Sequence, residues 1–212
     1  LDDVAASDQF YATATNMDAN GNTIVDAQTK LPDCLIAGPA SVSHTTGGGA
    51  LNLEFSHALA QLTVVVKAGS TFPAGVSLSG AKISTPGMIQ NTSGGAYNAD
   101  GSFALVASGT TAPYSNLVTT YDATKKQAEL TAIVVPQTLA AGSKFVVTLA
   151  NGNAYTATLA TEVSLKASQN NALTLTLNPT AAKVAAVTVA NWGTGADAAA
   201  DAAIDGVTVS TE

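Results

Sequence analysis

The sequence predicts an all-β protein, a β-sandwich with Greek-key connections built from roughly six to eight short strands. Three observations support this fold class. Apolar and polar residues alternate with a period of two in several short runs, turn residues follow about every ten positions, and no segment forms a convincing amphipathic helix. With 212 residues, the chain is long enough to bury a core of its own.

The central strand is predicted at residues 51–66, the longest run of strand-favouring residues in the chain. Its apolar residues fall on odd numbers up to Leu59 and on even numbers from Leu62 onward. A change of phase requires one extra residue, because neighbouring side chains point to opposite faces of a strand. We therefore expect a β-bulge near residues 60–61.

Residues 1–46 contain less strand-forming sequence than a sandwich needs. They offer an alternating piece at 9–14, a turn at 16–21 and a short apolar segment at 34–37. We interpret this part as the remnant of an N-terminal lobe, or as edge strands with a linker.

Three glycines at 47–49 form a flexible joint, and we place the domain boundary there. The sandwich domain is predicted to span residues 47–192 and to end at the single tryptophan, Trp192. An acidic, alanine-rich tail follows at 193–212. Its one helix candidate, residues 196–204, is weak because its aspartates repel one another at i, i+4 spacing.

The later strands are predicted from alternation and from turn residues. The clearest of them lie at 128–135, 144–149, 155–159, 173–177 and 184–189. Pro136 stops the first of these strands, because proline cannot donate a hydrogen bond to the sheet. Asn151 and Gly152 predict a tight hairpin between the second and the third.

The composition indicates a secreted or surface protein. Only 11% of the residues are charged, the net charge is −7, and the eight basic residues are all lysines. Nucleic acid and anionic membrane surfaces are excluded as partners, since both require clustered basic side chains. A single cysteine, Cys34, excludes an intrachain disulfide bond, and its apolar neighbours favour burial.

No residue pattern supports an enzyme, a cofactor or a metal site. His57 lacks a nucleophile and an orienting group at a recognisable spacing, so we interpret it as a hydrogen-bonded histidine of the core. Asn16, Asp18 and Asn20 match the first half of a calcium loop, but Ala27 stands where the bidentate glutamate belongs. An Asx-rich turn is therefore expected there.

Several segments in order resemble the fimbrillin-like proteins of Bacteroidetes-type anaerobes, which are subunits and accessory proteins of type V pili. The resemblance covers about 140 residues, and the ordered set of segments is more specific than any one of them. The matching segments are FSHALAQL at 55–62 with a valine-rich strand after it, VVPQ at 134–137, LTLTLN at 173–178 and Asn191-Trp192.

The resemblance implies a transthyretin-like Greek-key sandwich, export as a lipoprotein precursor, and a place in fimbriae on the cell surface, outside the outer membrane. It also implies assembly with other pilin subunits by donor-strand exchange, in which an extended segment of one subunit completes the sheet of the next. The best donor is residues 206–210, with Val207 and Val209 on one face. The same segment could instead close its own sheet.

The resemblance leaves the position in the pilus open, because the family also contains tip and anchor proteins. Stalk subunits of the family are matured by proteolysis after a basic residue, a role that Lys30 could serve here. A second hypothesis is an adhesin that does not polymerise and whose loops bind a host glycan or protein. Tyr114 and Tyr121 are the predicted ligand contacts, because glycan binding uses exposed aromatic rings.

Overall fold

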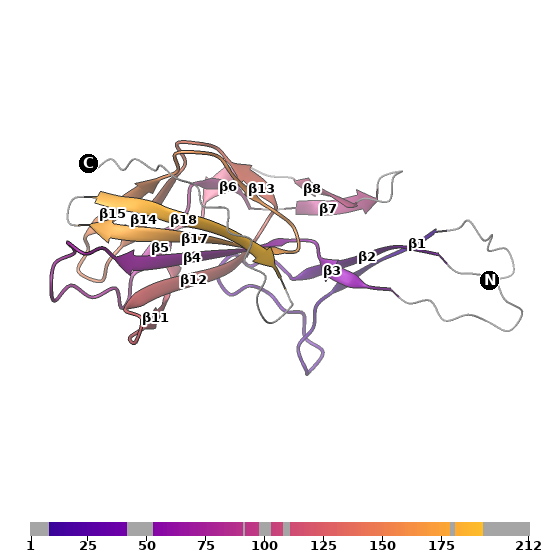
Figure 1. The fold of residues 1–212 in the computed structure, drawn as a ribbon. Helices are drawn as coiled ribbons and strands as arrows, with labels where there is room; N and C mark the ends of the chain where they lie inside the picture. The colour runs from indigo at the N-terminus through magenta and orange to yellow at the C-terminus, as the bar shows by residue number, and fades with distance from the viewer. Residues whose placement is uncertain are drawn as a thin grey trace, which may run out of the picture.

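A computed structural model describes residues 9–41, 53–90, 92–97, 103–107, 111–178 and 181–192. Within these ranges the secondary structure consists of β-strands, as predicted, and no helix is long and apolar enough to cross a membrane. Two sheets form a sandwich, and a smaller sheet projects from one end of it (Figure 1).

One layer is a five-stranded sheet in the order β11-β12-β4-β17-β18. Its strands are β11 (Thr120–Asp122), β12 (Gln127–Val134), β4 (Ala60–Ala68), β17 (Gln169–Asn178) and β18 (Ala181–Asn191). The other layer is a four-stranded sheet in the order β10-β5-β14-β15. Its strands are β10 (Leu117–Val118), β5 (Lys82–Ser84), β14 (Lys144–Thr148) and β15 (Ala154–Thr158).

Shorter pairs of strands complete the description. They are β13 (Gln137–Leu139) with β16 (Val163–Leu165), β6 (Gly87–Ile89) with β9 (Thr111–Pro113), and β7 (Thr92–Tyr97) with β8 (Phe103–Ala107). The projecting sheet has the order β1-β2-β3, with β1 (Gln9–Thr15), β2 (Cys34–Ser41) and β3 (Phe55–His57).

Strand β4 lies in the middle of the larger sheet, which confirms a central strand in this part of the chain. It pairs antiparallel with β12 from Ala60 to Lys67 and parallel with β17 on its other side. Leu62, Val64 and Val66 are fully buried on its inner face. Thr63, on the opposite face, donates a hydrogen bond of 2.8 Å to the side-chain oxygen of Asn170 on β17.

The expectation of one continuous strand with a bulge over residues 51–66 is wrong. Strand β3 ends at His57, β4 begins at Ala60, and the two strands belong to different sheets. Ala58 and Leu59 form the bend between them, and both side chains are buried. The change of phase therefore marks the point where the chain leaves the projecting sheet and enters the sandwich.

The main core lies between the two layers. Leu130 and Leu173 from the larger sheet belong to the same buried cluster as Ile83 and Phe145 from the smaller one, and all four side chains are fully buried. A satellite core lies at the junction with the projecting sheet. It consists of Leu31, Leu59, Ile133 and Val135, with the partly buried side chains of Ile89 and Trp192 packed against it.

The hairpin prediction at Asn151 and Gly152 is confirmed. Strands β14 and β15 pair antiparallel on either side of these residues, and Gly152 adopts a φ of 88°, which glycine reaches without strain. The predicted joint at 47–49 and the helix candidate at 196–204 lie outside the described residues. The domain boundaries and the transthyretin-like strand order stay predictions.

Candidate assembly surface

Strand β12 is paired along only part of one edge. On one side β4 accompanies it from Gln127 to Val134. On the other side β11 reaches only from Gln127 to Glu129. The chain preceding β11 turns away, because β10 pairs with β5 of the opposite layer. In the described part of the chain, residues 130–134 therefore have no neighbouring strand on this side.

Two side chains take the place of the missing strand. The backbone N–H of Ile133 donates a hydrogen bond of 3.1 Å to Oδ2 of Asp26. The backbone N–H of Val118, across the gap, donates to Oε1 of Gln28. Polar backbone groups at a sheet edge need such partners when water does not reach them. Asp26 and Gln28 thus satisfy donors on both sides of the gap.

On β12, Thr131 lies between Glu129, where the pairing with β11 ends, and Ile133, whose N–H donates to Asp26. Groups on alternate residues of a strand point to the same edge, so the backbone of Thr131 faces the gap, as that of Ile133 does. Among the described residues, no hydrogen-bond partner is found for the backbone N–H or C=O of Thr131. This residue therefore presents an open donor and an open acceptor.

Asp26 and Gln28 belong to a tight turn at residues 26–31, which we call the plug loop. Oδ1 of Asp26 accepts hydrogen bonds from the backbone N–H groups of Gln28 and Thr29, at 2.9 and 2.6 Å. Lys30 is exposed and has a φ of 63°, in the left-handed region. Leu31 then enters the satellite core, where it is 7% exposed. The loop is thus anchored by a carboxylate and by an apolar side chain.

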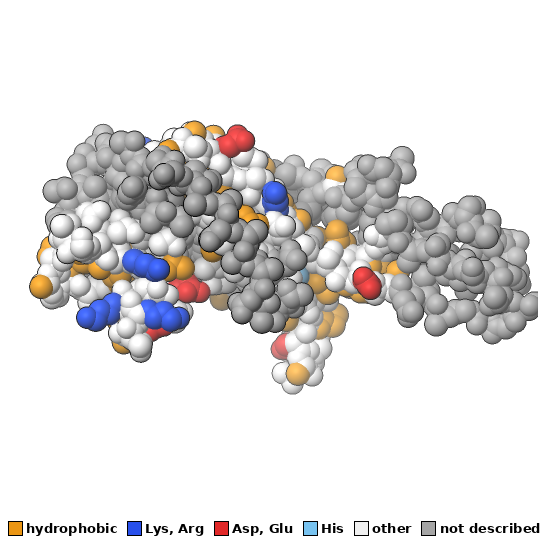
Figure 2. Space-filling model, viewed as in Figure 1, with side chains coloured by type: hydrophobic (Ala, Val, Ile, Leu, Met, Phe, Trp, Pro, Cys, Tyr) orange, Lys and Arg blue, Asp and Glu red, His pale blue; other side chains and the backbone are white. Residues whose placement is uncertain are grey.

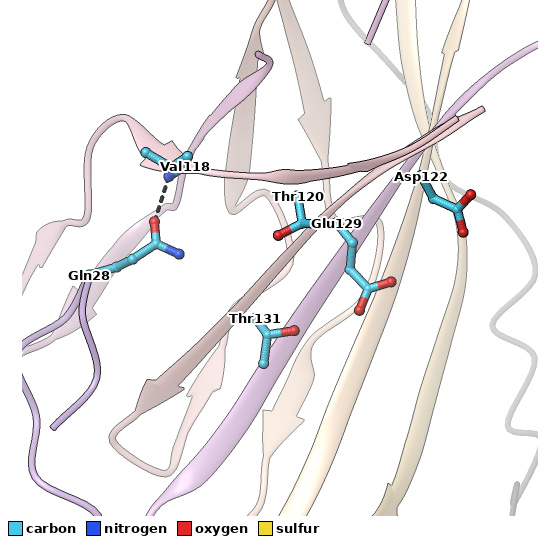
Figure 3. Close-up of a pocket in the computed structure, with 6 residues that line it drawn as sticks. All are labelled: Gln28, Val118, Thr120, Asp122, Glu129 and Thr131. Atoms are coloured by element: carbon cyan, nitrogen blue, oxygen red, sulfur yellow. Dashed lines mark hydrogen bonds between the residues drawn. The ribbon is translucent and has the colours of Figure 1, made fainter. Parts of the chain in front are cut away.

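A hollow of about 360 Å³ lies beside the gap, on the outer face of the sheet. Figure 3 shows Gln28 at one end, Asp122 at the other, and Thr120, Glu129 and Thr131 between them. Asp122 accepts backbone hydrogen bonds from Lys125 and Thr124, and these bonds lower the pKa of its carboxyl group. The lining is polar and acidic, apart from Val118, which is 63% exposed.

An arm formed by residues 16–25 projects from the molecule next to the plug loop (Figures 1 and 2). The backbone of this arm is closed by a bridge between Met17 and Thr23. Oδ1 of Asp18 accepts the backbone N–H groups of Asn20 and Asn22, at 2.8 and 2.9 Å. These hydrogen bonds lower the pKa of Asp18 and form the Asx-rich turn that the sequence predicts.

His57 joins the projecting sheet to the sandwich. Its Nδ1 lies 2.7 Å from Oδ1 of Asp33, a buried residue whose Oδ2 also accepts a hydrogen bond from Asn16. The ring stacks on Trp192, at the end of β18. The hydrogen-bonded histidine predicted from the sequence is confirmed, and its partners are structural groups. Among the described residues, no group of three or more His, Cys, Asp or Glu side chains could hold a metal ion.

The model of the fimbrillin-like family matches residues 4–192. The chain belongs to the fimbrillin-like family. This finding confirms the resemblance seen in the sequence and supports a fimbrial or adhesive role on the cell surface for this fimbrillin-like protein.

Solved structures agree with this fold. A proposed cell adhesion protein from Bacteroides uniformis aligns with a TM-score of 0.56 and 23% identity, over 89% of this chain and 68% of that one. A second one, from Bacteroides ovatus, aligns with a TM-score of 0.51 and 18% identity, over 88% of this chain and 62% of that one. No curated protein sequence matches significantly.

Of the four residues predicted as sites in this fimbrillin-like chain, two lie outside the described residues, one is buried and one is half-buried. Val207 and Val209 lie outside the described residues. Tyr114 is 8% exposed, and its hydroxyl group donates a hydrogen bond of 3.4 Å to the backbone oxygen of Gln90. A ligand on the surface cannot reach this ring, so Tyr114 is a core residue. Tyr121, on β11, is half-buried and remains the candidate of the two.

No sequence pattern pointed to Asp26, Gln28 or Thr131. Asp26 and Ile133 are 107 positions apart, and Gln28 and Val118 are 90 positions apart. The local sequence around an aspartate or glutamine in a loop is the same whether or not its side chain hydrogen-bonds a distant backbone group.

Cys34 is half-buried, and its burial, together with the nearby charge of Asp33, raises the pKa of its thiol.

Proposed function

We propose that this fimbrillin-like chain is a structural subunit of surface fimbriae, is assembled by β-strand exchange, and contributes to cell adhesion. The observation that carries the proposal is the family match over residues 4–192. Its partners are other pilin subunits, of the same or of another kind. The chain would be exported as a lipoprotein precursor and act outside the outer membrane.

The proposed donor is the segment 206–210, which contains Val207 and Val209. Its valines alternate with Thr208 and Ser210, so one face is apolar and the other polar. An added strand supplies backbone hydrogen bonds, and its alternate side chains enter pockets of the acceptor. Assembly of this kind needs no catalytic side chain, which agrees with the absence of a catalytic pattern in the sequence.

Electrophoresis of the protein from its native host tests this function. Strand-exchanged polymers dissociate very slowly, so an unboiled sample should run as a ladder that boiling converts to a single band. A chain ending at Asp205 lacks the proposed donor and should give a single band without boiling. A ladder that is unchanged by the truncation would place the donor elsewhere, and a single band from the full chain would rule out a strand-exchanged stalk.

The alternative is a tip or anchor adhesin that binds a glycan or a protein and does not polymerise. The polar hollow next to β11 favours it, because carboxylate, amide and hydroxyl groups there could hydrogen-bond a ligand. Tyr121 does not line this hollow, and its partly buried ring packs against the main core. Tyr121→Ala should therefore weaken adhesion and also lower the melting temperature, whereas Tyr121→Phe keeps the ring and tests the hydroxyl group alone. Unchanged adhesion would exclude Tyr121 as a contact.

A further inference from the structure

We propose that the hollow on the outer face of the larger sheet binds one neutral sugar ring, a pyranose at the end of a glycan chain. Glu129 is the main contact, and Thr120, Thr131 and Gln28 are the others. This proposal rests on the adhesive role within the proposed function and extends it, since it names the class of ligand and the residues that hold it. The predicted contact Tyr121 is not among them, because its ring does not line the hollow.

The carboxylate that is free to bind a ligand belongs to Glu129. Among the described residues, its half-buried side chain has neither a hydrogen bond nor an ion pair. Asp122 differs, because its Oδ1 accepts the backbone N–H groups of Thr124 and Lys125. Its Oδ2 also lies 3.4 Å from Nζ of Lys125. The turn between β11 and β12 thus uses Asp122, and Glu129 remains available.

Neutral hydrogen-bonding groups surround this carboxylate. Thr120 lies opposite Glu129 in the register of β11 and β12, and Thr131 follows two residues later, so the three side chains share one face (Figure 3). Gln28 adds a donor. Its Oε1 accepts the N–H of Val118, which leaves both N–H bonds of Nε2 without a partner in the described part of the chain. A ligand here must therefore offer donors and acceptors at once.

A neutral sugar meets this requirement better than a cation or an anion does. Each sugar hydroxyl group both donates and accepts, so adjacent hydroxyls can donate to Glu129 while their oxygen atoms accept from Gln28. A cation would find one free carboxylate and would face the N–H donors of Gln28. Acidic sugars are disfavoured, because Glu129, Asp122 and the net charge of −7 repel them.

The size of the hollow agrees with a single ring. Ligand pockets have volumes of about 300–1,000 Å³, so a hollow of about 360 Å³ is among the smaller ones. Val118 supplies an apolar wall, and its side chain, in a residue that is 63% exposed, can pack against the C–H groups of a pyranose. The open N–H and C=O groups of Thr131 can hydrogen-bond further hydroxyls at the border of the hollow. The terminal ring therefore fits, and the rest of the glycan stays in solvent.

Binding of multivalent sugars by the purified full chain tests the site. The probes are serum albumin that carries many copies of galactose, mannose or N-acetylglucosamine, albumin that carries sialic acid, and unmodified albumin. Many copies raise the avidity of a weak single contact. We expect saturable binding of at least one neutral probe, inhibited by the same free sugar, and no binding of the other two. High salt should leave this binding unchanged, because the ligand carries no charge to be screened.

Two matched pairs of variants locate the contact. Glu129→Gln should weaken binding tenfold or more, because it replaces a charged acceptor by a neutral one, and Thr131→Val should weaken it several-fold. Glu54→Gln and Thr138→Val make the same changes at exposed positions away from the hollow and should leave binding unchanged. A thermal melt of each variant checks its fold. If Thr131→Val lowers the melting temperature, Thr120→Val tests the hydroxyl groups in its place.

The outcomes separate this site from the proposed function. Binding of no neutral probe, a preference for sialic acid, or sugar binding that Glu129→Gln leaves unchanged would overturn the proposal. Glu129-dependent binding of polylysine in place of the sugars would assign the hollow to a cationic partner and would overturn it too. The heat-sensitive ladder of the fimbrial fraction is measured separately. A ladder without sugar binding refutes the sugar site alone, whereas sugar binding without a ladder refutes the strand-exchanged stalk and favours the adhesin.

Discussion

The indole ring of Trp192 lies flat against the imidazole ring of His57, with 3.7 Å between the ring centroids and 12° between the ring planes. The stack joins the end of β18 to the end of β3. Because Nδ1 of His57 also lies 2.7 Å from Oδ1 of Asp33, the contact links the sandwich to the first strands of the chain. The backbone N–H of Trp192 is fixed in addition by the carbonyl oxygen of Ser168.

This stack should be measurable as a coupling free energy. A double-mutant cycle with His57→Ala and Trp192→Ala, followed by urea unfolding, should give about 0.5–1.5 kcal/mol of coupling. His57→Ala alone should cost more, roughly 1–3 kcal/mol, because it removes a partner from the buried carboxyl group of Asp33. Effects of the two substitutions that simply add would mean that the ring contact contributes nothing.

Gly69 should not tolerate a side chain. A Cβ atom there would lie 2.1 Å from Oδ1 of Asn178 and 2.8 Å from the backbone oxygen of Leu177, which itself accepts the N–H of Gly69. Gly69→Ala should lower the free energy of unfolding by about 1–3 kcal/mol. Gly87→Ala is the matched control, since nothing lies within 4 Å of its Cβ position. Denaturant melts of equal midpoint for the two variants would contradict the close approach of residues 69 and 178.

Tyr114 should ionise at an unusually high pH for a tyrosine. Burial, with a smaller contribution from the charge of Asp26, raises the pKa of Tyr114 to about 12. Because the folded-state pKa lies above the unfolded value, the stability from the neutral phenol is complete below about pH 10 and is lost as the pH rises through about 12. Near-ultraviolet absorbance should show a late titration step that Tyr114→Phe removes. Absence of a late step that Tyr114→Phe removes would place this ring in water.

Local chemistry explains which elements could be predicted from the sequence. The strand at 128–135 ends near Pro136 because proline has no N–H group to donate to a sheet. The hairpin forms at Asn151 and Gly152 because Gly152 adopts a positive φ. Both causes act within a few residues of the chain. The alternation of Leu173, Leu175 and Leu177 likewise placed β17 correctly, since all three side chains are fully buried.

Features that depend on distant segments could not be predicted in the same way. The change of phase after Leu59 looks identical whether a strand bulges or passes into a second sheet, because the choice depends on the pairing of β3 with β2 and of β4 with β12 and β17. The burial of Tyr114 depends equally on a partner, Gln90, that lies 24 positions away. The hydrogen bonds of the plug loop to β12 and β10 also join residues that lie far apart in the sequence.

The central claim, assembly by strand exchange, is tested most directly by changing one face of the proposed donor at a time. In unboiled gels of the fimbrial fraction, Val207→Asp with Val209→Asp should abolish the heat-sensitive ladder, because charges would enter apolar positions of the acceptor. Thr208→Asp with Ser210→Asp adds the same charge to the polar face and should retain most of the ladder. A ladder that survives the valine substitutions, or that both pairs weaken equally, would contradict an alternating donor strand.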